Sequence, residues 1–223
     1  MKELLRQAID QGQKALSEYD AKMVLKESGI PVTREVLATS EEEAVAAARD
    51  LGFPLVLKGV SPTLLHKSES GMVKLNIGSE EQVRKAYGEI TEAGMELDGV
   101  LVQEMVKGNR ELVMGLLRDP SFGPCVMFGL GGIFTEVLKD VTFRIAPFDH
   151  QDALEMIGEL KAGQILDEFR GNPAIDRDHL AEILVAMGNL GLNFPEIEEV
   201  DVNPLIVTGN RVVAVDALVV LSS

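Results

Sequence analysis

Acidic and amide side chains recur near the end of the chain, in the segment EVDVNPL and in VVAVDALVV. Glu199, Asp201 and Asn203 alternate along a strand pattern, and the two-residue period of a strand places them on one face. Asp216 falls among apolar residues on the partner strand, where an unpaired carboxylate would be costly to bury. Mg²⁺ takes a few protein oxygens and leaves its other positions to phosphate and water, so it would explain these residues. The alternative is a carboxylate near the turn that pairs with Arg211.

Two other features could bind a phosphate. The segment GLGGIF, residues 129–134, has three glycines in four residues, which leave backbone N–H groups free to approach an anion closely. A bulge or turn between strands is the alternative, and the segment matches neither the dinucleotide fingerprint nor the Walker pattern. Lys58 ends the apolar segment FPLVLKG, so its ammonium could bind a phosphate at the rim of a cleft or extend to solvent.

One histidine lies in a polar segment, SPTLLHKSESGMVKL, between two apolar segments that are typical of strands. The chain has only three histidines, and His66 is followed directly by Lys67. A polar loop that needs polar residues would also explain a single loop histidine. The residues by themselves therefore leave the role of His66 open.

Helix and strand patterns alternate and predict an α/β (α+β) protein. KGN, residues 107–109, reads as the turn of a hairpin between 99–106 and 110–119. A boundary near residue 97 would give two α+β lobes, 1–97 and 98–223, and a cleft between lobes is a favoured place for a ligand. Helices are expected at 2–28 in two pieces, 40–52, 79–94, 149–162 and 176–190. Strands are expected at 32–38, 54–59, 72–77, 99–106, 110–119, 124–138, 141–147, 196–208 and 211–221, the last two as a hairpin around Gly209 and Asn210.

The composition is that of an ordinary globular protein: 223 residues, 46% hydrophobic and 26% charged. A net charge of −15 argues against non-specific nucleic-acid binding. No apolar segment approaches the ~20 residues that span a bilayer, and MKELLRQAIDQGQKALSEYD lacks the apolar centre of a secretory signal. The single cysteine, Cys125, cannot form an internal disulfide. We expect a cytoplasmic protein that binds neither nucleic acid nor membrane.

Several of these stretches together resemble one family. They are LSEYDAKMVLKESGIPVTREVLATSEEEAVAAARDLGFPLVLK, HKSESGMVKLNI, VLVQEMV, ELVMGLLRDPSFGPCVMFGLGGIFTEVLKDVTFRIAP and EVDVNPLIV. They are similar to the ATP-grasp beta subunit of ADP-forming acyl-CoA synthetases, the ADP-forming acetyl-CoA synthetase family, over nearly the whole chain. The resemblance implies an ATP-grasp fold with the nucleotide cleft between its lobes. It also implies a reversible reaction in which acyl-CoA, ADP and phosphate give acid, CoA and ATP.

The resemblance assigns a role to individual positions. Lys58 would hold nucleotide phosphate, Glu104, Met105 and Val106 would line the adenine slot, and Glu111 would face the ribose or the metal. Gly131 and Gly132 with Glu136 would shape the phosphate end, where Arg144 would help. Asn203 and Asp216 would bind Mg²⁺. An alpha subunit that carries the CoA-binding domain and the active-site histidine is implied as the partner, in an α2β2 assembly.

His66 matches the family's second histidine, which is proposed to carry phosphate between the partner's histidine and ADP. A neutral imidazole nitrogen is a good phosphoryl acceptor, and the phosphoramidate is labile enough to pass the group on. Lys67 would attract the phosphoryl group, and Glu69 could orient the ring through its other nitrogen. After HKS this chain has Glu-Ser-Gly-Met where the family has an aspartate and a glycine-rich stretch, which leaves the role of Glu69 open.

Two other functions are compatible with these residues. One is a self-contained ATP-grasp ligase that joins a carboxylate to an amine or thiol through an acyl phosphate, without a phosphohistidine. The other is a non-catalytic nucleotide-binding regulator, which loss of Lys58 or of the metal pair would have favoured.

Overall fold

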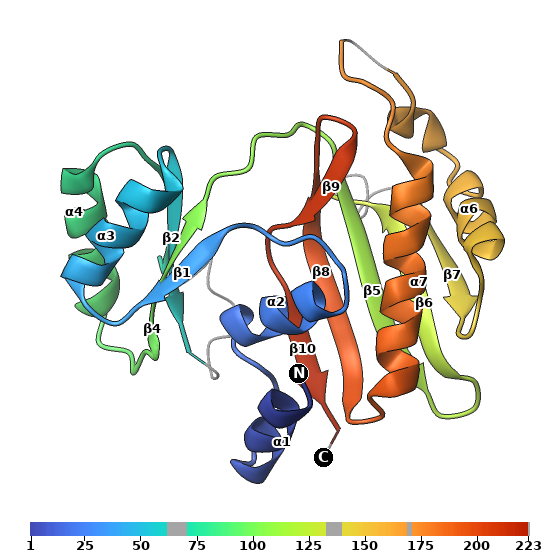
Figure 1. Cartoon of the computed structure of the whole chain (residues 1–223), viewed down its shortest axis with the longest axis horizontal. Helices are drawn as coiled ribbons and strands as arrows, with labels where there is room; N and C mark the ends of the chain where they lie inside the picture. The colour runs from blue at the N-terminus through green and yellow to red at the C-terminus, as the bar shows by residue number, and fades with distance from the viewer. Residues whose placement is uncertain (62–70, 133–139, 169–170, 223) are drawn as a thin grey trace. The chain divides into compact units, whose positions relative to one another are not determined.

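The chain forms two compact units, shown in Figure 1. The computed structural model describes residues 1–61, 71–132, 140–168 and 171–222. Unit 1 comprises Met1–Val32 together with Lys107–Ser223, and unit 2 comprises Thr33–Val106. Unit 2 is therefore one continuous segment, whereas unit 1 is built from both ends of the chain.

Unit 2 is a four-stranded antiparallel sheet with two helices packed against it. The strand order is β1 (Glu35–Ala38), β4 (Gly99–Glu104), β2 (Leu55–Val60) and β3 (Val73–Ile77). The helices α3 (Glu41–Leu51) and α4 (Glu80–Thr91) begin at Ser40 and Ser79, whose hydroxyl oxygens accept N–H bonds from the first turn. Buried alanines, valines, leucines and isoleucines between sheet and helices form the core of this unit.

Unit 1 is built on a six-stranded sheet of order β10-β8-β5-β6-β7, in which β9 also pairs with β8. Its strands are β5 (Glu111–Asp119), β6 (Gly123–Leu130), β7 (Val141–Ile145), β8 (Ile197–Thr208), β9 (Arg211–Ala214) and β10 (Leu218–Leu221). The long helix α7 (Arg177–Asn193) packs on β5 and β6, and α6 (His150–Gly158) packs on β7, on the same face of the sheet (Figure 1). A short 3₁₀ helix, η1 (Gly163–Leu166), follows α6.

The first two helices belong to unit 1. They are α1 (Lys2–Asp10) and α2 (Glu18–Glu27), and the N-cap of α2 is Ser17, whose side chain accepts the N–H of Asp20. Leu16 donates its N–H to the carbonyl of Val219, so the start of the chain is tied to β10. Within α2 the ammonium of Lys22 lies 2.8 Å from the Glu18 carboxylate, and both side chains are 1% exposed.

Strand register assigns each side chain of this sheet to a face. Gly115 lies opposite both Asp201 and Met127, and Met127 lies opposite Phe143, so these residues share one face. The intervening residues, such as Met114, Val126 and Thr142, point to the other face, where they are buried under α6 and α7. We call the first of these the open face.

Three expectations differ from the structure. Residue 97 is not the boundary, because β4 is an inner strand of unit 2 and the N-terminal helices belong to unit 1. Residues 107–109 do not join a hairpin, because β4 pairs with β1 and β2 whereas β5 pairs with β6 and β8. The last predicted strand is divided, because β9 pairs with the end of β8 and β10 with its beginning. Among the described residues, no helix is long and apolar enough to cross a membrane.

Candidate functional site

Asn203 and Asp216 lie on adjacent chain segments of unit 1. Leu218 is the register partner of Asp201, and the N–H of Val215 donates to the carbonyl of Pro204 at 3.1 Å. Asp216 therefore occupies the break between β9 and β10, directly beside Asn203. One carboxylate oxygen of Asp216 accepts the N–H of Ala217 at 2.9 Å. The predicted metal pair is thus brought together by the irregular end of β10 rather than by a continuous hairpin.

The charges near this pair favour a cation. Burial raises the pKa of the Asp201 carboxyl, and the nearby charges of Glu199 and Asp216 raise it further. Arg211, the alternative partner of Asp216, instead lies 3.5 Å from the carboxylate of Asp176. Within the described part of the chain, no three His, Cys, Asp or Glu residues are grouped to hold a metal on their own. Any Mg²⁺ here would have to take most of its ligands from phosphate and water, as Mg²⁺ commonly does.

Glu111 and the glycine segment also meet in unit 1. The N–H of Gly131 donates to the Glu111 carbonyl at 2.7 Å. A Cβ at Gly131 would stand 2.8 Å from the Glu111 carbonyl carbon, closer than real side chains approach. Gly132 has a φ of +62°, which favours glycine, and the Glu111 carboxylate lies over it. Glycine is thus required for close approach at 131 and for backbone conformation at 132.

These two clusters belong to the same sheet. Gly115 of β5 is the register partner of Asp201, and Glu111 is four residues earlier on the same strand. The even spacing along β5 places Glu111 on the open face with Asp201. The pairing shifts between Val202 and Leu205, where β8 has one residue more than β5. The Glu111 carboxylate and the glycine segment are therefore at the end of β5, and Asn203 lies on the neighbouring strand β8.

Lys58 lies within β2 of unit 2, between Val73 of β3 and Leu101 of β4. Its side chain is buried, with only 5% of the residue exposed. Extension of the ammonium into bulk solvent, one of the two readings of its sequence, is therefore excluded. Binding of a phosphate by this ammonium stays a prediction from the sequence.

Glu104, Met105 and Val106 end unit 2 in half-buried positions. The Glu104 carboxylate accepts the backbone N–H of Arg34 at 2.8 Å and the Arg34 Nε–H at 2.7 Å. Met105 donates its N–H to the carbonyl of Pro54 at 3.2 Å. The Glu104 side chain is therefore engaged within unit 2, and contacts of this segment with an adenine would come mainly from backbone groups and from Met105 and Val106.

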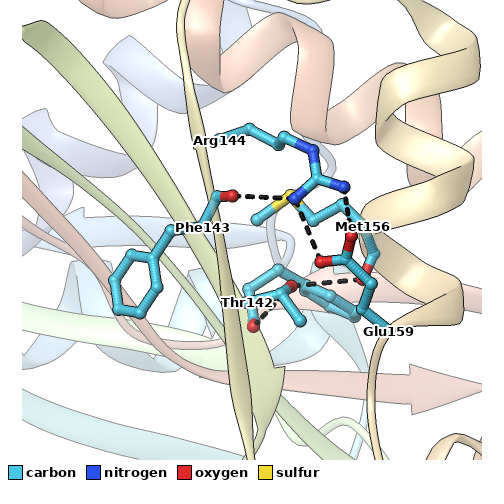
Figure 2. Close-up of polar contacts among 6 residues, drawn as sticks. Thr142, Phe143, Arg144, Met156 and Glu159 are labelled. Carbon is cyan, nitrogen blue, oxygen red and sulfur yellow. Dashed lines mark hydrogen bonds and ion pairs between the residues drawn. The ribbon is translucent and has the colours of Figure 1, made fainter.

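Arg144 lies on the face of β7 opposite to the open face (Figure 2). Its guanidinium forms a bidentate ion pair with the Glu159 carboxylate, with N–O distances of 2.6 and 3.0 Å. It also donates a hydrogen bond to the Phe143 carbonyl. The hydrogen bonds that the guanidinium donates to Glu159 raise its pKa. Phe143 points the other way in Figure 2, so the structure does not bring Arg144 together with Glu111 and the glycines.

Three predicted site residues, His66, Glu69 and Glu136, lie outside the described residues. Arg110, by contrast, is a residue whose importance the sequence did not indicate. It is 5% exposed, and its guanidinium donates to the carbonyls of Ile165, Asp167, Pro173 and Gly209. It fixes the backbone immediately before Glu111, so it positions the residue that covers the glycines. An arginine after Lys-Gly-Asn gives no sign of this, because all its acceptors are distant backbone carbonyls.

The sequence and the fold both match known proteins. The family model of an ATP-grasp domain matches residues 7–221. The chain is 46% identical over 212 residues to the acetate–CoA ligase [ADP-forming] I subunit beta of Pyrococcus furiosus, which covers 92% of this chain and 91% of that protein. It therefore belongs to the ATP-grasp family, among the beta subunits of ADP-forming acyl-CoA synthetases. It is a ligase subunit of the kind that works with a partner subunit.

Solved structures agree with this assignment. Acetyl-coenzyme A synthetase 1 of Ca. Korarchaeum cryptofilum, in complex with coenzyme A, Ca-AMPCP and HgCl⁺, superimposes with a TM-score of 0.95 at 48% identity and 99% coverage of both chains. A second structure of that enzyme contains coenzyme A and Mg-AMPPCP, with a phosphohistidine segment pointing towards the nucleotide binding site. It gives a TM-score of 0.89 at 47% identity, again over 99% of both chains.

Proposed function

We propose that this chain is the nucleotide-binding subunit of a reversible ADP-forming acyl-CoA synthetase, and that it passes a phosphoryl group between its partner and ADP or ATP. The observation that carries the proposal is the contact of Glu111 with Gly131 and Gly132, at the end of a strand, β5, that pairs with β8, the strand that carries Asn203. A glycine segment without side chains allows a phosphate to approach closely, and the oxygen ligands of Asn203 and Asp216 suit its metal ion. Buried Lys58 of unit 2 supplies a phosphate-binding cation.

Asn203 and Asp216 are the residues that would hold Mg²⁺. Their oxygens are hard ligands of the kind that Mg²⁺ prefers. The ion would neutralise charge on the phosphates during transfer. The Mg-AMPPCP complex of the Korarchaeum enzyme supports this choice of metal.

The phosphoryl group travels through histidine in this proposal. His66 accepts it from the partner's histidine and delivers it to ADP, with Lys67 attracting the group and Glu69 orienting the ring. Dividing one long transfer into short in-line steps makes positioning the main source of catalysis. The phosphohistidine segment in the Korarchaeum structures supports a histidine route in this family.

The partner is an alpha subunit that carries the CoA-binding domain and the active-site histidine, in an α2β2 complex. The beta-subunit names of the Pyrococcus relatives support a separate partner. In the Archaeoglobus relative the matching region makes up 30% of a longer chain, which supports a partnership between the same parts. Acyl and CoA recognition would then lie mainly in the alpha subunit.

The test compares the purified chain alone with the chain mixed with an alpha subunit of the family. Alone, it should bind ADP or ATP in an Mg²⁺-dependent manner yet make no acyl-CoA from ATP, CoA and a panel of carboxylic acids. With the alpha subunit, acyl-CoA should form and a phosphohistidine should be detectable on blots. Robust acyl-CoA formation by the chain alone would instead favour a self-contained ligase.

A further inference from the structure

The open face of unit 1 has a second feature beside the candidate site. A hollow of about 530 Å³ lies over β5, β6, β7 and β8. Its apolar lining includes Leu117, Phe122, Met127, Phe143 and Ile145. Strand register explains this lining, because Leu117 lies opposite Cys125 and Cys125 lies opposite Ile145, so all three side chains point to the open face.

The apolar side chains of this hollow are exposed to an unusual extent. Phe122 is 66% exposed, Phe143 and Leu117 are each 56% exposed, and Ile145 is 48% exposed. Single exposed apolar residues are common, but several that line one hollow mark a surface that another molecule covers. The opposite faces of the same strands are covered by α6 and α7, so the open face is the part of this sheet that the described residues of unit 1 leave uncovered.

One side of the hollow is acidic. Glu199 lies directly opposite Leu117 in the register of β5 and β8, and Asp201 lies two residues further along the same face. Asp119 also lines the hollow. Asp119, Glu199 and Asp201 thus place three carboxyl side chains in the lining of the hollow. The hollow therefore complements an apolar segment that carries positive charge at one end.

The acidic side of the hollow leads to the candidate metal site. Asp201 lines the hollow, and Asn203 follows two residues later along β8. A segment seated among Phe122, Phe143 and Ile145 would thus extend along the sheet toward Asn203 and Asp216. A polypeptide that delivers a phosphoryl group to that end would have to be held nearby, and the hollow is an adjoining surface that could hold it.

We propose that this hollow docks a segment of the partner alpha subunit. Apolar side chains of that segment are seated between Leu117, Phe122 and Phe143, and a lysine or arginine lies beside Glu199 and Asp201. The inference rests on the proposed function, since it identifies the surface by which the partner reaches the nucleotide end of unit 1. Burial of large apolar side chains supplies the affinity, and the carboxylates set the direction of the segment.

The experiment measures phosphoryl transfer from Mg-ATP to the alpha subunit while the concentration of the alpha subunit is varied. The double variant Phe122→Gln/Phe143→Gln should raise the half-saturating concentration of the alpha subunit at least about tenfold, as expected for loss of central apolar anchors. Phe143→Leu should keep it near the wild-type value. Leu192→Gln, which replaces another exposed apolar residue of unit 1 on α7, is the matched control and should also leave it unchanged.

Two controls separate docking from other effects. Calorimetry on each variant without the alpha subunit should give wild-type nucleotide affinity, which shows that the site and the fold are intact. Glu199→Gln should make the half-saturating concentration less dependent on salt, because a charge pair is lost.

The possible results decide between three readings. If the double variant has the wild-type half-saturating concentration of the alpha subunit, the docking proposal is overturned and the proposed function stays intact. If the wild-type chain binds nucleotide but phosphorylates no alpha subunit, both the proposed function and the docking surface fail. If sedimentation shows a wild-type homodimer that the double variant abolishes, with transfer unchanged, the hollow binds a second copy and the proposal is overturned.

Discussion

The carboxylate of Glu111 lies over Gly132 so closely that a Cβ at Gly132 would stand 3.1 Å from its Oε2 atom. The same glycine has a φ of +62°, so a side chain there would be strained as well as crowded. Gly209 offers a comparison, since its φ is +60° and a Cβ would meet nothing within 4 Å. The two positions therefore separate backbone strain from the displacement of Glu111.

We predict that Gly132→Ala and Gly209→Ala lower the free energy of unfolding by a similar amount, about 1–2 kcal/mol, because both place alanine in the left-handed region. Only Gly132→Ala should also weaken nucleotide binding, because only there does the new methyl group meet the Glu111 carboxylate. Denaturant titration and calorimetry on both variants check this. Equal nucleotide affinities in the two variants would argue against a role for the Glu111–glycine contact in binding.

Lys58→Met should weaken ADP and ATP binding by about 1.5–3 kcal/mol, the range for a hydrogen bond to a charged group. Methionine keeps much of the apolar stem of the buried lysine, so the β2 core should stay packed. Lys74→Met is the control, because Lys74 lies on neighbouring β3 and forms an ion pair with Glu89. If calorimetry finds the same nucleotide affinity in Lys58→Met and Lys74→Met, Lys58 does not bind phosphate.

His66→Ala should abolish acyl-CoA synthesis by the complex while leaving nucleotide affinity nearly unchanged, because a relay acts on the phosphoryl group in transit. His179→Ala is the matched control and should retain activity. Turnover and phosphohistidine blots are the measurements. A His66→Ala complex that keeps more than about a tenth of wild-type turnover, equivalent to ~1.4 kcal/mol of barrier, would show that His66 is not the relay.

Asp201 should make the stability of the chain depend on pH. Its carboxyl pKa is raised above 3.8, so the folded chain retains a proton that the unfolded chain has released. The free energy of unfolding therefore falls as the pH rises from 3.8 through the raised pKa, and the loss is complete above it. Asp201→Asn should thus melt at a higher temperature than wild type at pH 7, but not below about pH 3.

Thermal melts at both pH values test this, with Glu198→Gln as the control because Glu198 is an exposed acid on the same strand. The control should change the melting temperature little at either pH. If Asp201→Asn and the wild type melt at the same temperature at pH 7, the raised pKa assigned to this carboxyl is contradicted.

Local signals in the sequence predicted the helices of this fold well. Ser17, Ser40 and Ser79 each cap the helix expected after them, because a serine followed by acidic residues satisfies the first N–H groups wherever the helix lies. The proximity of Asn203 and Asp216 also followed from sequence, because a terminal hairpin around Gly209 brings its two arms together whether or not the second arm is broken.

Contacts between residues far apart in the chain could not be predicted from such local signals. Residues 107–109 separate two apolar strands and have a turn composition, yet both edges of β4 are taken by β1 and β2. Arg144 alternates with apolar residues and so resembles a solvent-facing or ligand-facing group. Its carboxylate partner, Glu159, comes from the end of α6, which only the tertiary packing brings to β7. Arg110 is the strongest case, since its acceptors are backbone carbonyls that carry no sequence signal.

The interrupted course of unit 1 affects how the chain folds as it is made. Residues 33–106 emerge from the ribosome as one complete unit, with all the strands of their sheet present before β5 is synthesised. Residues 1–32 emerge earlier but must wait until β10 is made, because Leu16 donates its N–H to the carbonyl of Val219 and Leu221 donates its N–H to the carbonyl of Lys14. Chains that stop before β10 would therefore contain a folded unit 2 but an incomplete sheet in unit 1. Their N-terminal segment would lack its partner strand, and the exposed surfaces would be bound by chaperones.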